Sequence, residues 1–258
     1  MGRIITKEEL AEATSYDRFC CVYRLADDKT IVKTGSIIRL AEAEAMKFVR
    51  EHTKIPVPQV YNAYRDEESG HVRIVMEYVE GERLDHAWYK LTTEEKESII
   101  GQLRGHFAEL RKISGSFIGS VDGSPCEDPY FSHDPGAYGP YSNEEAFNRG
   151  LVKSWTTDRG DEWTLKLCEM LCATMKDHKI VLTHNDFDPR NILVRGPEVV
   201  AVLDWEQSGF YPEYWEHCRA LWRPTWDSGW MREKLVDRVL EPYYKELGVM
   251  WNTSYTMW

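Results

Sequence analysis

One polar loop between two apolar runs constrains the fold of this chain more than any other feature. Residues 181–194 read VLTHNDFDPRNILV, and residues 199–206 read VVAVLDWE. The apolar residues of these two segments predict short buried strands. After the polar loop, the chain must pass through a hairpin before it reaches the polar residues of LDWE. This path predicts one cluster of polar side chains, formed by His184, Asp186, Asn191 and Asp204.

These residue types suit phosphoryl transfer, which depends on positioning and on neutralising the charge of phosphates. Asp186 suits the acceptance of a proton from a hydroxyl group. Asn191 offers a neutral oxygen and Asp204 a carboxylate, and Mg²⁺ prefers such hard oxygen ligands. His184 is expected to orient the loop by hydrogen bonding. Each residue alone is more typical of a turn or a cap, so the prediction rests on their combination in one short span.

The composition is that of a globular protein and argues against several partners. Hydrophobic residues make up 42% and charged residues 29%, and the formal net charge is -11. A nucleic-acid backbone requires basic patches, so nucleic acid is not expected as a partner. No apolar stretch approaches the roughly 20 residues of a membrane helix, and no membrane partner or secretory signal is expected. The six cysteines show no CxxC spacing, which favours reduced thiols in the cytoplasm.

The first 80 residues alternate between β-rich runs and one helix. A helix is expected from about Ile38 to His52, because apolar residues recur there at helical spacing. Pro56 and Pro58 require it to end before them. Strands are expected in two pairs around short turns, at residues 20–26 with 29–33 and at residues 60–64 with 71–79.

After Gly81 the pattern changes to helices. Thr92 with Glu95, and Ser142 with Glu145, match the capping box that begins a helix. A further helix is expected near 162–177. The segment 114–142, here called the insertion, is too rich in glycine and proline for a regular element and is expected to be a functional loop. The predicted domains are a β-rich nucleotide-binding lobe (1–80, with a hinge at about 77–82) and a helical lobe (83–258).

The motifs HNDFDPRNILV and LDWE resemble those of the aminoglycoside phosphotransferase and choline kinase superfamily. The stretches TIVKTG, AEAEAMKFV, IPVPQVY, IVMEYVEG and GFYPEYWE fit the same pattern, so the likeness covers most of residues 20–220. It looks closest to fungal phosphotransferase-family proteins of unassigned substrate. The resemblance implies an α+β, protein-kinase-like fold with two lobes, a small antiparallel β-sheet lobe with one helix and a larger, mainly helical lobe. It also implies ATP and Mg²⁺ as cofactors and a hydroxyl group of a small molecule as the acceptor.

The resemblance implies further site residues. Lys33 would pair with the phosphates and needs a helix glutamate to hold it. Glu42 lies nearer the apolar face of its helix than Glu44 and is preferred, with Glu44 as the alternate. The hinge would be formed by Met76, Glu77 and Val79, where backbone groups of Glu77 and Val79 would read the adenine edge. Arg190 joins His184 and Asp186 among the catalytic candidates.

The acceptor pocket is predicted less sharply. Glu206, Glu216 and Trp222 are candidates to line it, because acidic groups and tryptophan faces favour an amine-bearing alcohol. Core tryptophans and surface glutamates are an equal alternative. The acceptor itself and the oligomeric state stay open at this stage.

One departure from the family pattern raises alternatives for the whole chain. No glycine lies between Gly2 and Gly35, where a glycine-rich phosphate loop is expected. A catalytically altered, kinase-fold binding protein is therefore one alternative to a phosphotransferase. The other is a biosynthetic enzyme that activates a hydroxyl group as a phosphate so that it can leave.

Overall fold

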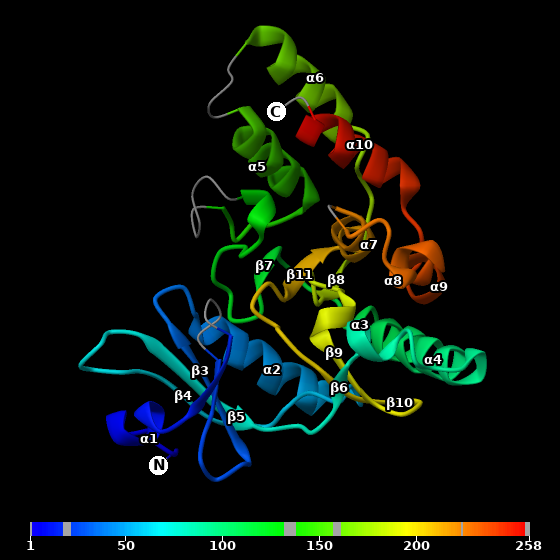
Figure 1. Ribbon diagram of the computed structural model, residues 1–258. Helices are drawn as coiled ribbons and strands as arrows, with labels where there is room; N and C mark the ends of the chain where they lie inside the picture. Colours follow the sequence, from blue (N-terminus) through cyan, green and yellow to red (C-terminus); the bar gives the residue numbers. More distant parts are fainter. Residues whose placement is uncertain (1, 18–21, 132–137, 157–160, 223, 256–258) are drawn as a thin grey trace.

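The computed structural model describes residues 2–17, 22–131, 138–156, 161–222 and 224–255. At one end of the molecule lies a five-stranded antiparallel sheet of order β1-β2-β3-β5-β4 (Figure 1). Its strands, in chain order, are β1 (Thr14–Asp17), β2 (Val22–Arg24), β3 (Thr30–Gly35), β4 (Val60–Arg65) and β5 (Val72–Glu77). The four strands expected from the sequence are present, although residues 20 and 21 of the first lie outside the described residues.

Helix α2 (Leu40–His52) packs against this sheet. It begins two residues later than expected and ends at the expected residue. Its buried face is made of small and apolar side chains, including Ala43, Ala45 and Val49. Small side chains let the helix lie close to the sheet, which fixes the position of its polar residues relative to β3.

A second, smaller core covers the opposite face of the sheet. Ile5, Leu25, Val32 and Val75 form it, and Leu10 packs against it from the short helix α1 (Lys7–Ala11). No pattern in the sequence predicted α1 or β1. Alternating strand residues therefore contact two different apolar layers, and the central strands β3 and β5 are buried on both faces.

Helices make up most of the remaining chain, as expected. The predicted capping box of Thr92 and Glu95 is confirmed at the start of α4. The predicted cap of α5 is wrong by one residue. Asn143 caps this helix in place of Ser142, because Asn143 Oδ1 accepts the backbone N–H of Ala146 at 2.9 Å. The helices are α3 (Leu84–Ala87), α4 (Thr93–Leu110), α5 (Glu144–Thr156), α6 (Glu162–Cys172), α7 (Trp215–Ala220), α8 (Gly229–Arg232), α9 (Leu235–Val239) and α10 (Tyr244–Tyr255). None of the described helices is long and apolar enough to span a bilayer.

Two three-stranded antiparallel sheets follow, the first beside α3 and α4 and the second between the large sheet and the outer helices α5, α6 and α10 (Figure 1). One has the order β10-β9-β6 and the other β7-β11-β8. In the latter, a Cβ atom on Gly209 would clash with the carbonyl oxygen of Gly119, so β7 and β11 require glycine to approach this closely. The strands are β6 (Glu82–Arg83), β7 (Gly119–Ser120), β8 (Ile180–Thr183), β9 (Ile192–Arg195), β10 (Glu198–Val202) and β11 (Gly209–Pro212).

The antiparallel sheet with one helix and the larger helical part give the α+β, protein-kinase-like architecture that the sequence predicts. The main core is continuous from α2 through α4 to α7 and α10. Trp215, Tyr211 and Phe147 are fully buried in it. Trp215 is therefore a core residue.

Candidate functional site

Glu216 on α7 holds the backbone of the polar loop that follows β8. The two carboxylate oxygens of Glu216 accept the backbone N–H groups of His184 at 2.6 Å and Asn185 at 3.0 Å. Glu216 is 2% exposed, and this burial raises the pKa of its carboxyl. The expectation that Glu216 contacts the acceptor is corrected, because both of its oxygens face the loop backbone and none faces solvent.

His184 links the loop to the end of the hairpin. Its Nδ1 accepts the backbone N–H of Asp186 at 3.2 Å, so its Nε2 carries the proton and donates to the carbonyl oxygen of Leu203 at 2.8 Å. The ring lies 4.5 Å from that of Trp205 and is buried. Both nitrogens are engaged by backbone, which fits the orienting role expected of His184.

Asn191 is fixed by Asp186. Its amide nitrogen donates to the Asp186 carboxylate at 2.6 Å and to the Asp186 carbonyl oxygen at 3.0 Å. Only the NH₂ group can make both bonds, so the amide oxygen of Asn191 is left for another partner. Burial, and then the negative charge of Asp204, raise the pKa of Asp186. An acid with a raised pKa is a better proton acceptor when ionised.

The hairpin of β9 and β10 carries Asn191 and Asp204 to the same place. Ile192 pairs with Val202 at the end of the ladder, and the Leu203 N–H donates to the Asn191 carbonyl oxygen at 2.8 Å one step beyond it. Asp204 follows with a left-handed φ of 62°, which redirects the chain at this point. The two oxygen donors predicted for Mg²⁺ are therefore brought together by backbone pairing.

Lys33 on β3 lies among three carboxylates. Its ammonium nitrogen is 3.0 Å from Glu42, 2.8 Å from Asp204 and 3.2 Å from Glu206. Burial opposes the charge of Lys33, yet the three carboxylates outweigh it and raise the pKa of Lys33. The same three carboxylates form the one cluster of three or more potential metal ligands in the described ranges.

The choice between the two helix glutamates is decided by the geometry. Glu42 is fully buried and faces Lys33, whereas Glu44 is half exposed and pairs with Lys47 on the same helix. Burial raises the pKa of Glu42 to about 7, although the charge of Lys33 works in the other direction. Glu42 thus meets the expectation, and the alternate Glu44 does not.

The segment predicted as a hinge spans the end of β5 and the residues that follow it. The Glu77 N–H donates to the Gln59 carbonyl oxygen at 2.9 Å, and the Tyr78 N–H donates to that of Lys29 at 2.8 Å. Met76 is buried in the main core. The backbone N–H of Val79, just past the strand, donates to no group in the described parts of the chain. That N–H is available to a ligand in the place where the sequence predicts an adenine contact.

Two other predicted site residues, Arg190 and Trp222, lie outside the Lys33 cluster. Arg190 pairs with Asp188 at 2.9 Å, and its side chain is 63% exposed. Trp222 lies against the ring of Tyr130, at 4.9 Å between centroids, and beneath the guanidinium of Arg219. The structure therefore does not bring the expected acceptor residues into one pocket, because Glu206 lies beside Lys33 and Trp222 beside the insertion.

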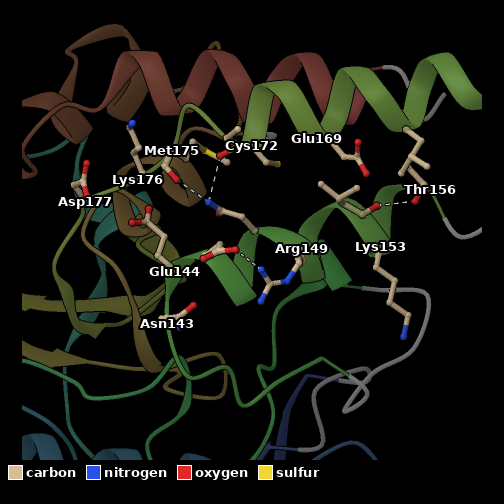
Figure 2. A pocket seen from close by; sticks show the side chains of 15 residues that line it. Asn143, Glu144, Arg149, Lys153, Thr156, Glu169, Cys172, Met175, Lys176 and Asp177 are labelled. Carbon is tan, nitrogen blue, oxygen red and sulfur yellow. Dashed lines mark hydrogen bonds and ion pairs between the residues drawn. The ribbon is translucent and has the colours of Figure 1, made fainter.

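A cavity of about 1020 Å³ lies elsewhere, between α5 and α6. Figure 2 shows Glu144, Arg149 and Lys153 among the lining residues on α5, with Glu169 and Cys172 on α6. Asn148 crosses between these helices by donating to the carbonyl oxygens of Cys172 and Met175. None of the loop, hairpin or Lys33 residues lines this cavity, so it is not part of the candidate site.

Sequence reasoning missed two contributions to the site. Asn185 has a φ of 72°, and its amide nitrogen donates to the Gln207 carbonyl oxygen at 2.9 Å. Asparagine tolerates the left-handed region better than most residues, which was the available signal. Asp128 of the insertion forms a buried ion pair with Arg219 at 2.8 Å. No local sequence pattern predicts this ion pair.

Comparison with known proteins relates the fold to one family. Residues 23–247 match the phosphotransferase enzyme family. The ternary complex of streptomycin, ATP and APH(2″)-IIa is 18% identical, covers 95% of this chain and 82% of that chain, and superposes with a TM-score of 0.62. A putative aminoglycoside phosphotransferase from Ralstonia eutropha is 16% identical and superposes with a TM-score of 0.56. That match covers 94% of this chain and 74% of the other chain. At these identities the likeness shows the shared fold.

A curated fungal protein matches a shorter region. The subtelomeric hrmA-associated cluster protein of Aspergillus fumigatus is 40% identical over 65 residues, which are 24% of this chain. The match spans only 13% of the length of that relative. It agrees with the fungal resemblance of the motifs and assigns no substrate.

Proposed function

Because the chain belongs to the phosphotransferase enzyme family, we propose that it transfers the γ-phosphate of ATP, with Mg²⁺, to a hydroxyl group of a small molecule. The observation that carries this proposal is the convergence of Asp186, Asn191, Asp204 and Lys33 through two independent contacts. Asn191 donates to Asp186 at 2.6 Å, and Lys33 donates to Asp204 at 2.8 Å.

The oxygen donors of the site suit the proposed metal. The amide oxygen of Asn191 and the carboxylate of Asp204 would hold Mg²⁺, which would supply neutralisation of phosphate charge. Lys33 would pair with the phosphates, and Glu42 would hold Lys33 in position. Glu206, within reach of Lys33, adds a third carboxylate to this part of the site. In the proposed role, Glu206 lies on the side of the nucleotide phosphates and does not line a separate acceptor pocket.

Asp186 would act as the base. Its carboxylate would take the hydroxyl proton while the acceptor oxygen bonds to the γ-phosphorus and the bond to the bridging oxygen of ADP breaks. Burial within the loop supports this role, since it raises the pKa of Asp186. His184 would keep the loop in register through its two backbone contacts, and Arg190 would act only through its charge near Asp186.

The adenine would lie at the hinge between the proposed lobes 1–80 and 83–258. The N–H of Val79, which has no acceptor among the described residues, and the backbone carbonyl of Glu77 support this placement. The four described cysteines are free, which supports a reducing compartment such as the cytoplasm.

An amine-bearing alcohol is the proposed acceptor class. The net charge of -11 favours a cationic partner. Trp222 would offer an aromatic face, as expected from the sequence, if the acceptor reaches the insertion. A kinase-fold binding protein is the second candidate, and the observation favouring it is the lack of glycine from residue 3 to residue 34.

Transfer of labelled γ-phosphate from ATP to a panel of hydroxylated amines tests the proposal. The purified protein should label at least one acceptor, and Asp186→Ala should abolish labelling while ATP with Mg²⁺ still binds. Product mass spectrometry separates a gained phosphate from loss of water, the sign of the biosynthetic alternative. Binding of ATP without any transfer or hydrolysis in the wild type would support the binding protein instead.

A further inference from the structure

Two adjacent residues of the insertion reach in opposite directions. Glu127 contacts Arg39 at the start of α2, and its neighbour Asp128 pairs with Arg219 on α7 at 2.8 Å. We propose that this Glu127–Asp128 bridge holds the Lys33–Glu42 pair in register with the loop that carries Asp186, and that Arg39 is a positioning residue for phosphoryl transfer. This inference rests on the proposed function.

The first arm of the bridge ends on the turn that carries Glu42. The guanidinium of Arg39 donates to Glu127 and, at 2.7 Å, to the hydroxyl of Ser124. The backbone carbonyl of Arg39 accepts the Glu42 N–H at 3.3 Å in the first turn of α2. A displacement of Arg39 would therefore displace the helical turn from which Glu42 reaches Lys33.

The second arm ends on the loop before Asp186. Asp128 is buried, and it accepts the indole N–H of Trp215 at 3.0 Å as well as facing Arg219. Arg219 donates to the side chain of Gln207 at 3.1 Å, and the Gln207 carbonyl oxygen accepts the amide of Asn185 at 2.9 Å. The chain of contacts thus runs from Asp128 to the residue next to Asp186.

A backbone hydrogen bond closes the part of the insertion just before Glu127 and Asp128. The Ser120 N–H donates to the Ser124 carbonyl oxygen at 3.0 Å, closing a tight turn at Gly123, whose φ is 83°. Ser120 belongs to β7, which pairs with β11 through Gly209. Because β11 follows the LDWE motif in the chain, both arms start from a segment that is paired with the next strand after Asp204.

The test uses the exposed arm, because Arg39 and Glu127 are partly exposed, whereas substitution of the buried Asp128 endangers folding. Arg39→Ala, Glu127→Ala and the double variant are compared with Lys47→Ala as the control. Lys47→Ala also removes one ion pair of the same helix, but the partner in that pair, Glu44, belongs to α2 itself. Two quantities are measured, the Kd for ATP with Mg²⁺ and the amide exchange rates of residues 40–45.

Each single variant should raise the Kd about two- to fivefold, the effect of a partly exposed ion pair, and the double variant should raise it no further. Arg39→Lys should restore part of the affinity, and amide exchange over residues 40–45 should be faster in Arg39→Ala than in Lys47→Ala. The proposal is overturned if Arg39→Ala and Lys47→Ala agree in both quantities, or if the two single effects add. The exchange measurement needs no nucleotide, so it tests whether the bridge holds the first turn of α2 even if the wild type fails to bind ATP.

Discussion

Lys33 donates to Asp204 over 2.8 Å, although 171 positions separate them in the chain. The contact joins the large sheet to the hairpin that carries Asn191, and it explains why the ammonium of Lys33 stays charged while buried. Its partner Glu42 has no access to solvent and depends on Lys33 for its counter-charge. The arrangement implies that these two residues stabilise the fold only as a pair.

Lys33→Met should destabilise the protein by about 3–5 kcal/mol at pH 8, because it leaves Glu42 as an uncompensated buried charge. The loss should be smaller at pH 5.5, since the pKa of Glu42 is already raised to about 7 and protonation removes the charge. Urea denaturation at both pH values measures this. The double variant with Glu42→Gln should recover much of the lost stability, and an equally unstable double variant would contradict the pairing.

Glu216→Gln should loosen the loop that carries Asp186. The new amide nitrogen would face a backbone N–H that now donates to a carboxylate oxygen, so one buried donor loses its partner at a cost of about 1–3 kcal/mol. Turnover should fall more than affinity for ATP with Mg²⁺. Denaturation and steady-state kinetics on the same preparation check this, and unchanged stability would show that the two contacts contribute little.

Asn185 offers a matched pair of substitutions. Asn185→Gly and Asn185→Ala both remove the bond to Gln207, but only alanine is strained at a φ of 72°. The glycine variant should be the more stable of the two by about 1–2 kcal/mol, the cost of the left-handed region for an L-residue. Thermal and urea denaturation measure the difference. Equal stabilities would mean that the loop backbone relaxes in the alanine variant.

His178 should make stability depend on pH. Burial lowers the pKa of His178, but its 2.6 Å contact with Glu144 and the nearby charge of Glu246 outweigh burial and raise it. The stabilisation is therefore complete below the ordinary histidine pKa near 6.5 and is lost as the pH rises through the raised value.

The measurement for His178 is the free energy of unfolding between pH 6 and pH 9. His178→Gln should flatten the decline over this range, because the titrating group is gone. A decline of the same size in wild type and variant would assign the pH dependence to other groups.

The sequence predicted the fold, and it predicted the clustering of the candidate site residues where the signal is local. Asp186 and Asn191 share one loop, and the hairpin that carries Asp204 follows from two apolar runs. The choice of Glu42 over Glu44 followed from helical periodicity, which decides the buried face of α2. Such features depend on neighbours within a few positions.

The contacts that the sequence did not predict join distant segments. Glu216 lies about 30 positions beyond the loop that it holds, and Asp128 is still farther from Arg219 in the chain. Their carboxylates looked like surface or acceptor groups, because burial and backbone partners depend on tertiary packing. The cap of α5 fell one residue from its predicted place, since Ser142 and Asn143 are both good caps and only the path of the insertion selects between them.

Stabilisation of the protein by ATP, measured with and without Mg²⁺, tests the central claim most directly. At a hundredfold excess of ligand over its Kd, wild type should gain about 2.7 kcal/mol when Mg²⁺ is present. Most of this gain should disappear without Mg²⁺ and in Asp204→Asn, which keeps its size but loses the charge that would hold the metal. No stabilisation of the wild type, or equal stabilisation with and without Mg²⁺, would contradict the assignment of this cluster as a site for ATP with Mg²⁺.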